Sequence, residues 1–328
     1  MKTAFSSWSR EARLLPLFVP LMLAACSGSD SPTGAAGDAS ATLSVYLTDA
    51  PGDVSRVWVD VLGITGKGPG GLKVTLLDEP TGLIELTALE DDVMMLVEAL
   101  EMAPGPLNQL RFIIGGAVLE TEDGKIFVRG GAVHPAALEA TGELECPGCS
   151  TSGVKVSLSK DLSIEEGVNG LLLDFDVGQS FGKEAGNSGK WVMRPVLHGA
   201  KRNPANVGGE DDTFQIRGTV ALADAVVIPA CVGARSVDDF VPLATALTLV
   251  DEDGAPVVFS GVTKSQGTFK VKVLEADGYA MGFVEEIEFE DAKLVFVATA
   301  DPPEVTVDEG MPPPEVAYEI TSATCVEG

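Results

Sequence analysis

The sequence predicts a mainly β protein with two antiparallel β-sandwich domains, the first of which contains one short helix. Short runs rich in Val, Ile, Leu, Thr and aromatic residues recur from residue 42 to the end of the chain. Turn-rich pieces such as GKGPGG (66–71) and TEDG (121–124) separate these runs, and the chain holds 37 Gly and 20 Pro. Many short strands with tight turns and little helical periodicity are typical of antiparallel sandwiches. A chain of 328 residues has the length of about two domains.

The first 25 residues have the layout of a secretory signal peptide. A basic leader containing Lys2, Arg10 and Arg13 precedes residues 14–25, which are uncharged and mostly apolar. This apolar run is too short for a transmembrane helix, which needs about 20 residues. We therefore expect residues 1–25 to be removed during export.

The end of this segment, Leu23-Ala24-Ala25-Cys26, resembles the lipobox of bacterial lipoproteins. The resemblance implies that Cys26 receives a diacylglyceryl group, becomes the new N-terminus and is then acylated. Such a set of acyl chains is enough for stable anchoring in a membrane. Ser27 rather than Asp follows the cysteine, which by the sorting rule of enteric bacteria indicates the outer membrane of a Gram-negative bacterium. The alternative is an ordinary signal peptide with an incidental cysteine.

Changes in composition predict the domain boundaries. The lipidated cysteine and the small, polar residues that follow it predict a flexible tether over residues 26–41. The β-rich runs then predict a first sandwich domain over 42–200. The polar stretch KRNPANVGGEDD predicts a linker over 201–212, and the strand-like runs after it predict a second sandwich domain over 213–328.

One helix is expected in the first domain, over residues 90–103. Acidic residues begin this segment, apolar residues recur with helical spacing from Val93 to Leu100, and Pro104 follows. This pattern is typical of a short amphipathic helix that ends before a proline.

Several motifs distributed along the first domain carry a family resemblance. The segment YLTDAPGD (46–53) contains the triplet Thr48-Asp49-Ala50. The later motifs are LRFIIG (110–115), LLLDFDVGQSF (171–181) and KWVMRPVLHG (190–199). Together they resemble a bacterial family known only as domain of unknown function 4382, over roughly residues 42–200. Members are commonly secreted or lipid-anchored, so the resemblance implies an envelope location, but its motifs name no catalytic residue.

The second domain is expected to be a smaller sandwich with one wet face. Phe269, Val271 and Val273 alternate with Lys270 and Lys272, as in a strand that has one buried and one solvated face. The pieces IRGTV and GTFKVKVLEADGY resemble carboxypeptidase regulatory-like, or transthyretin-like, modules, which often occur on envelope proteins.

The four cysteines after Cys26 are expected to form disulfides, because the cell envelope is oxidising. Cys146 and Cys149 form a C-x-x-C around a Pro-Gly pair, where we favour a tight structural disulfide over a redox motif or half a metal site. A second C-x-x-C that would complete a zinc site is missing from the sequence. Cys231 and Cys325 are then expected to bridge the second domain, with cross-pairing to the C-x-x-C left open.

Four carboxylates at or near predicted strand ends are candidate metal ligands: Asp49, Asp53, Asp174 and Asp176. Asp174 and Asp176 lie at i and i+2, on one face of a predicted strand. With Asp49 or Asp53 from a nearby loop they could supply oxygens to Ca²⁺, although the spacing matches no known calcium loop. The alternative is that the strand carboxylates face solvent or pair with Arg111 and Arg194.

One motif resembles the nucleophile elbow of hydrolases. Residues 178–182, GQSFG, match G-x-S-x-G and follow a predicted strand. A Gly-rich stretch rather than a helix comes next, and the two histidines, His134 and His198, stand in no triad order. We interpret the motif as a turn and assign no catalytic residue.

The charge balance limits the function further. The chain has 22 Lys plus Arg against 49 Asp plus Glu, a net charge of −27, which argues against nucleic-acid binding and against docking on anionic lipid through a basic patch.

The sequence predicts a lipid-anchored cell-envelope protein, held at the membrane through Cys26, that acts as a non-enzymatic binding or scaffold module for an envelope protein or glycan and needs no cofactor. The alternative is a Ca²⁺-binding envelope protein that uses the strand-end carboxylates, with catalysis that the sequence does not reveal.

Overall fold

The computed structural model describes most of the chain from residue 40 onwards. The described residues are 40–50, 52, 54–90, 92–158, 162–184, 188–207, 214–227, 229, 243–247, 256–264, 267–284, 286–288, 292–308 and 310–327. They belong to one compact unit, which spans Ala39–Gly328. The expected signal peptide, Cys26, Asp53 and Cys231 lie outside the described residues.

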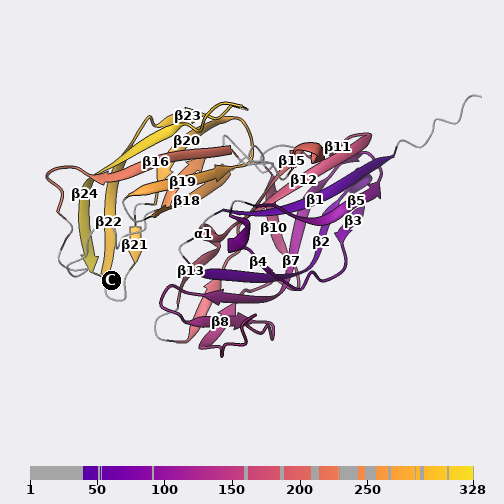
Figure 1. Cartoon of the computed structure of the whole chain (residues 1–328), viewed down its shortest axis with the longest axis horizontal. Helices are drawn as coiled ribbons and strands as arrows, with labels where there is room; N and C mark the ends of the chain where they lie inside the picture. Colours follow the sequence, from indigo (N-terminus) through magenta and orange to yellow (C-terminus); the bar gives the residue numbers. More distant parts are fainter. Residues whose placement is uncertain are drawn as a thin grey trace, which may run out of the picture. The chain divides into compact units, whose positions relative to one another are not determined.

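The fold is mainly β, as the sequence predicts, and has two large sheets. Each sheet comes from a continuous part of the chain, so in Figure 1 the strands β1 to β15 run from indigo to pink and the strands β16 to β24 from orange to yellow. A short pair, β6 (Gly105–Pro106) and β11 (Ser163–Ile164), forms a separate two-stranded sheet.

Thirteen strands of the described residues make up the first sheet. They are β1 (Ala41–Ala50), β2 (Arg56–Lys67), β3 (Lys73–Leu77), β4 (Leu83–Glu85), β5 (Met94–Met102), β7 (Asn108–Glu120), β8 (Ile126–Arg129), β9 (Gly142–Glu145), β10 (Val154–Leu158), β12 (Gly167–Asp176), β13 (Phe181–Glu184), β14 (Lys190–Met193) and β15 (Leu197–Arg202). The order across the sheet is β13-β14-β9-β8-β7-β10-β15-β12-β1-β5, and β2 pairs with β7, β3 and β4 beside this path.

The first sheet encloses one apolar core. Alternate residues of β1 and β12, such as Val45 and Leu173, are fully buried together with Val59 of β2 and Phe112 of β7. The rings of Phe112 and Phe175 meet edge-on with their centroids 6.4 Å apart. Burial of apolar side chains between two β layers is the main source of stability in a sandwich-type fold.

Both large sheets are mixed rather than purely antiparallel. β1 pairs in parallel with β12 along its whole length, from Ala41 opposite Gly167 to Ala50 opposite Asp176. β16 pairs in parallel with β24 in the second sheet. Parallel neighbours need a long crossover connection, and here the intervening strands of each sheet provide it.

The predicted helix over residues 90–103 is wrong: this segment forms the edge strand β5, which pairs antiparallel with β1. The pairing shifts register twice, and Ala99 has a positive φ of 46°. These irregularities interrupt the alternation of buried and exposed side chains, which is why Leu96, Val97 and Leu100 all pack on the core with a spacing that looks helical. The short α-helix of this region is α1 (Val177–Ser180), directly after β12.

Nine strands of the described residues form the second sheet. They are β16 (Phe214–Leu222), β17 (Leu243–Leu247), β18 (Val258–Lys264), β19 (Thr268–Val273), β20 (Gly278–Phe283), β21 (Glu286–Glu288), β22 (Ala292–Asp301), β23 (Glu304–Thr306) and β24 (Glu315–Glu327). Their order is β21-β22-β24-β16-β19-β18-β17-β20-β23. A second apolar core forms on this sheet, with Phe259, Tyr279 and Phe296 among its most buried side chains.

The strand β12 contributes to both apolar cores. Leu171, Leu173 and Phe175 belong to the first core, whereas Leu172 on the opposite face belongs to the second. Ala200 of β15 also packs in the second core. The face of β12 that carries Leu172 is therefore covered by the second sheet, and every residue of this strand from Asn169 onwards is buried.

The remaining elements are three short 3₁₀ turns, at Pro69–Gly71, Thr87–Leu89 and Pro204–Asn206. Among the described residues, we find no helix with the length and apolar character that crossing a membrane requires.

Candidate functional site

Three carboxylates meet at the ends of β1 and β12, where they are completely buried. Asp49 is the penultimate residue of β1, and Asp174 and Asp176 lie at the end of β12. The parallel register sets Ala50 opposite Asp176, so the two strand ends lie side by side. All three carboxylates have an exposed fraction of 0%. Burial of an ionised carboxylate is costly unless hydrogen bonds or a positive charge compensate it, so the surroundings of each decide its state.

Asp176 accepts hydrogen bonds from α1 and from the second sheet. Its Oδ1 accepts from the backbone N–H of Gln179 (2.8 Å) and thereby caps α1. The side-chain amide of Gln179 donates to Oδ2 (2.6 Å). From β18, the backbone N–H of Ser260 donates to Oδ2 (3.1 Å), and its hydroxyl donates to Oδ1 (2.8 Å). Burial raises the pKa of Asp176, and these donors oppose the rise by stabilising the ionised form.

Gln179 also connects α1 directly to the second sheet. Its side-chain amide also donates to the carbonyl of Val258 (2.8 Å) in β18. Asp176, Gln179, Ser260 and Val258 therefore form one hydrogen-bond network that ties α1 to the second sheet.

Lys272 of β19 brings the positive charge. Its side chain is 1% exposed, and Nζ donates to the backbone carbonyl of Asp49 (2.9 Å). The Asp49 carboxylate accepts from the backbone N–H of Val177 (3.3 Å) through Oδ1, while Oδ2 has no hydrogen-bond partner among the described residues. Burial, and then the negative charges of Asp174 and Asp176, raise the pKa of Asp49 well above its usual value, and Lys272 opposes the rise.

Asp174 is the least satisfied member of the cluster. Neither of its carboxylate oxygens has a hydrogen-bond partner within the described part of the chain. Burial, followed by the charge of Asp176, raises its pKa to about 8, against the opposing effect of Lys272. His198 lies opposite it on β15, with its ring 4.5 Å from that of Phe259, and burial lowers the histidine pKa to about 4. At neutral pH the site thus holds a protonated Asp174 beside a neutral His198.

Thr48, which precedes Asp49 in the TDA triplet, has a structural role. Its hydroxyl is buried and lies 3.1 Å from the carbonyl of Leu89 and 3.0 Å from that of Asp92, to either of which it can donate. This contact fixes the segment that leads into β5. The triplet at the end of β1 therefore contacts two segments: Thr48 contacts the approach to β5, and Asp49 contacts Lys272 of β19.

The structure brings together three of the four carboxylates proposed as calcium ligands, and the fourth, Asp53, lies outside the described residues. The alternative in which Asp174 and Asp176 face solvent or pair with Arg111 and Arg194 is wrong, because the second sheet covers this face of β12. Within the described ranges, no group of three or more His, Cys, Asp or Glu side chains is arranged to hold a metal ion. The ammonium group of Lys272 places a positive charge beside the three carboxylates.

Sequence reasoning missed the partners of this cluster, Ser260, Gln179 and Lys272. Lys272 was expected on the wet face of its strand, because it alternates with Val271 and Val273. It is buried because that face of β19 packs toward the end of β1. A single lysine on an alternating strand gives no signal of its partner, which lies 223 residues earlier in the chain.

Ser180, the central residue of G-x-S-x-G, is built into the fold. It is 0% exposed, and its hydroxyl donates to the carbonyl of Asp176 (2.5 Å) and accepts from the backbone N–H of Val196 (3.0 Å). The helix that follows β12 has four residues, and the geometry is that of a turn rather than a nucleophile elbow.

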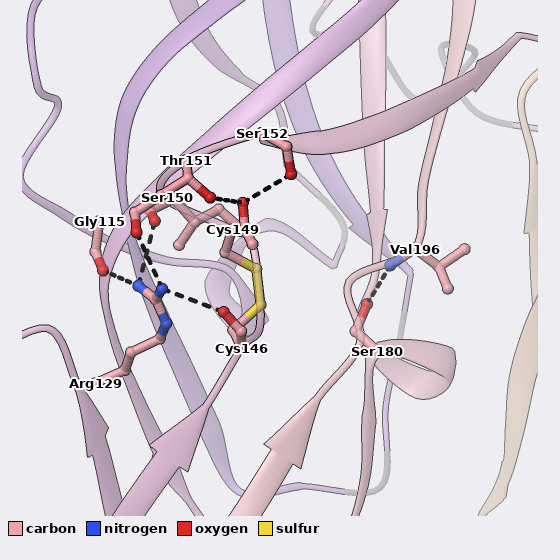
Figure 2. Close-up of a disulfide and its surroundings, with 11 residues drawn as sticks. Gly115, Arg129, Cys146, Cys149, Ser150, Thr151, Ser152, Ser180 and Val196 are labelled. Atoms are coloured by element: carbon pink, nitrogen blue, oxygen red, sulfur yellow. Dashed lines mark hydrogen bonds between the residues drawn. A yellow bond between two sulfur atoms is a disulfide. The ribbon is translucent and has the colours of Figure 1, made fainter.

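The C-x-x-C forms the expected disulfide between Cys146 and Cys149. Figure 2 shows Arg129 directing its guanidinium at this loop, where it donates to the carbonyl of Cys146 (3.2 Å), to the hydroxyl of Ser150 (3.3 Å) and to the carbonyl of Gly115. The backbone N–H of Ile114 also donates to the carbonyl of Cys149 (3.0 Å). The loop is thus attached to β7 and β8 by backbone and side-chain bonds. Cys325 is disulfide-bonded as well, and its expected partner Cys231 lies outside the described residues.

Comparison with known proteins places one part of the chain in a family. The sequence model of the family described as "Domain of unknown function (DUF4382)" matches residues 40–195. These residues are a DUF4382 domain. The domain supplies Asp49, Asp174 and Asp176 of the buried cluster, whereas Ser260 and Lys272 come from outside it.

No curated protein matches the chain. Among solved structures, a leucine-rich repeat protein from Bacteroides thetaiotaomicron is similar at 9% identity, over 88% of this chain and 24% of that one, with a TM-score of 0.13. This chain therefore spans about a quarter of that protein, and the likeness is too low to support an argument about fold or function.

Removing a donor from the buried cluster should loosen the attachment of the second sheet. In Ser260→Ala the hydroxyl donor to Asp176 is lost, and in Lys272→Met the buried cation is lost. We expect a loss of about 1–3 kcal/mol in the free energy of unfolding for the first change and about 3–5 kcal/mol for the second. Urea unfolding followed by circular dichroism measures both values.

Lys270→Met is the matched control for this measurement. Lys270 lies two residues from Lys272 and pairs with Glu90 at 3.8 Å, with both side chains partly exposed. A partly exposed pair contributes at most about 1 kcal/mol. An equal loss in Lys270→Met and Lys272→Met would contradict the role assigned to the buried lysine.

The cluster should also make the free energy of unfolding fall as the pH rises. The pKa of Asp174 rises from 3.8 to about 8 on folding, so between these values the folded chain holds a proton that the unfolded chain releases. Its contribution to the free energy of unfolding therefore falls as pH rises through this window. His198, whose pKa is lowered from 6.5 to about 4, acts in the opposite direction, but only below about pH 7.

We therefore expect the melting temperature to fall between about pH 7 and about pH 8, near the folded pKa of Asp174, and to level off above it, as measured by scanning calorimetry. Asp174→Asn cannot ionise and should reduce this fall. A melting temperature that rises over the same range, or the same fall in Asp174→Asn, would show that another group controls the dependence.

Proposed function

We propose that the chain is a lipid-anchored cell-envelope protein that acts as a non-enzymatic binding or scaffold module. One observation carries this proposal: the acidic residues of the DUF4382 motifs, Asp49, Asp174 and Asp176, are buried against a second β-sheet instead of facing a substrate. Thr48, Asp49 and Asp176 are each at most 1% exposed, and each makes a hydrogen bond within the fold. Residues used in this way support an architectural role for the domain.

The anchor forms the second part of the proposal. The lipobox-like Leu23-Ala24-Ala25-Cys26 supports acylation of Cys26, and Ser27 supports the outer membrane as the destination. The polar stretch up to residue 41 would act as a tether that holds the folded part away from the lipid. The net charge of −27 supports this arrangement, because it disfavours adsorption of the folded part to anionic lipid.

Two sheets that are joined by buried hydrogen bonds can present loops to a partner. The hydrogen bonds of Ser260, Gln179 and Lys272 oppose hinge motion between the DUF4382 domain and the second sheet. The resemblance of the second part to transthyretin-like modules supports a recognition role for it. We propose an envelope protein or a glycan as the partner of such a unit.

The experiment is cross-linking in living cells, with the intact protein and Cys26→Ala compared side by side. We expect the intact protein to fractionate with the outer membrane and to yield a specific envelope partner by mass spectrometry. The Cys26→Ala form should leave the membrane fraction and lose that partner. Lys270→Met, which keeps Cys26, is the control. Membrane fractionation that does not depend on Cys26 would contradict the anchor.

A second candidate function, calcium binding, is favoured by the unpartnered oxygens of Asp49 and Asp174. Carboxylate oxygens of this kind suit Ca²⁺, but Lys272 already places a positive charge beside them. Thermal unfolding with millimolar Ca²⁺ or with EDTA separates the candidates. The scaffold proposal expects equal melting temperatures. A rise of several degrees with Ca²⁺ that disappears in Asp174→Asn would instead support the calcium candidate, because a ligand stabilises the state that binds it.

A further inference from the structure

A pocket lies beside the disulfide loop of Cys146 and Cys149. It has a volume of about 560 Å³, which is in the usual range for a small-molecule site. The lining residues are Cys146, Pro147, Cys149, Gly153, Val154, Val192, Met193, Arg194, Pro195 and Val196. Figure 2 shows two of its borders, the disulfide and Val196. None of these residues belongs to the buried carboxylate cluster, so the pocket is a separate feature.

The residues that line the pocket range from buried and apolar to exposed and charged. Met193 is fully buried and Cys149 is 2% exposed. Val154 and Val192 are half-buried, whereas Arg194 is exposed. This combination of lining residues is typical of a site that takes a ligand with one apolar and one polar end.

Arg194 is the only charged residue among those that line the pocket. Its backbone N–H donates to the carbonyl of Ser180 (2.8 Å), which fixes the base of the side chain. Its guanidinium makes no hydrogen bond or ion pair with any described residue, although the chain carries 49 acidic residues against 22 basic ones. An arginine with no partner among the described residues has donors that can reach a ligand, and these donors suit a carboxylate.

We propose that this pocket binds a small amphipathic carboxylate. The apolar body lies against Met193 and the disulfide, and the carboxylate accepts hydrogen bonds from Arg194. The absence of an acidic side chain among the lining residues favours an anion here over a cation. This site goes beyond the proposed scaffold function, which does not depend on it.

The disulfide gives the site a dependence on redox state. It closes the loop that carries Pro147 and keeps the sulfur atoms in the wall of the pocket. An added dithiol, which is itself oxidised to a disulfide, converts the Cys146–Cys149 bond to two thiols, so that Pro147 is no longer held by a covalent ring. The reduced protein should therefore bind the ligand more weakly.

The test is calorimetric titration of the full-length protein in lipid nanodiscs with 4-phenylbutyrate, with empty nanodiscs as the blank. We expect saturable binding at millimolar ligand or below. Arg194→Gln should weaken binding about tenfold or more, because a hydrogen bond to a charged group is lost. The cationic isostere 4-phenylbutylamine should bind more weakly by a similar factor. Val192→Trp, which fills the pocket, should abolish binding.

Arg217→Gln is the matched control, since it removes the same charge from an exposed arginine of the second sheet. It should bind 4-phenylbutyrate as the unmodified protein does. Circular dichroism of each variant confirms that the fold is kept. The proposal is overturned if no saturable heat appears, if Arg194→Gln binds normally, or if the amine binds as well as the acid. None of these results bears on the anchor or on the buried cluster.

Discussion

A carboxylate that is buried away from water needs hydrogen-bond donors, a nearby cation or a proton. The packing of the two sheets in this protein depends on how three buried carboxylates meet that need. Asp176 has donors from its own helix and from Ser260. Asp49 lies near the ammonium of Lys272, and Asp174 holds its proton because its pKa is about 8. These solutions draw on both sheets, so the DUF4382 domain is electrostatically complete only with the second sheet in place.

The sequence was sufficient to predict the features that rest on local patterns. The mainly β class, the family of residues 40–195 and the Cys146–Cys149 disulfide are all confirmed. It failed where long-range pairing overrides a local pattern. The segment that contains β5 has helical spacing, but the free edge of β1 offers it a ladder of hydrogen bonds, and bulges absorb the mismatch.

The sequence likewise reveals some features of the candidate site and not others. Asp49, Asp174 and Asp176 could be picked out from the sequence because they are acidic residues at strand ends. Their burial could not be predicted, because it depends on β18 and β19, which lie much later in the chain. Periodicity reports which face of a strand is apolar, and it does not report which partner covers the polar residues on the other face. Lys272 is the clearest example, because its strand alternates as if one side were wet.

The parallel pairing of β1 with β12 has a consequence for how the chain folds. Ala41 lies opposite Gly167, so the first strand of the sheet waits for one that is synthesised much later. Contacts between such distant segments close slowly, because a long loop must lose its entropy before the pairing stabilises it. One edge of β1 can pair early with β5, but its other edge lacks its partner until β12 has been synthesised. The topology thus delays closure of the first sheet until most of its strands have been synthesised.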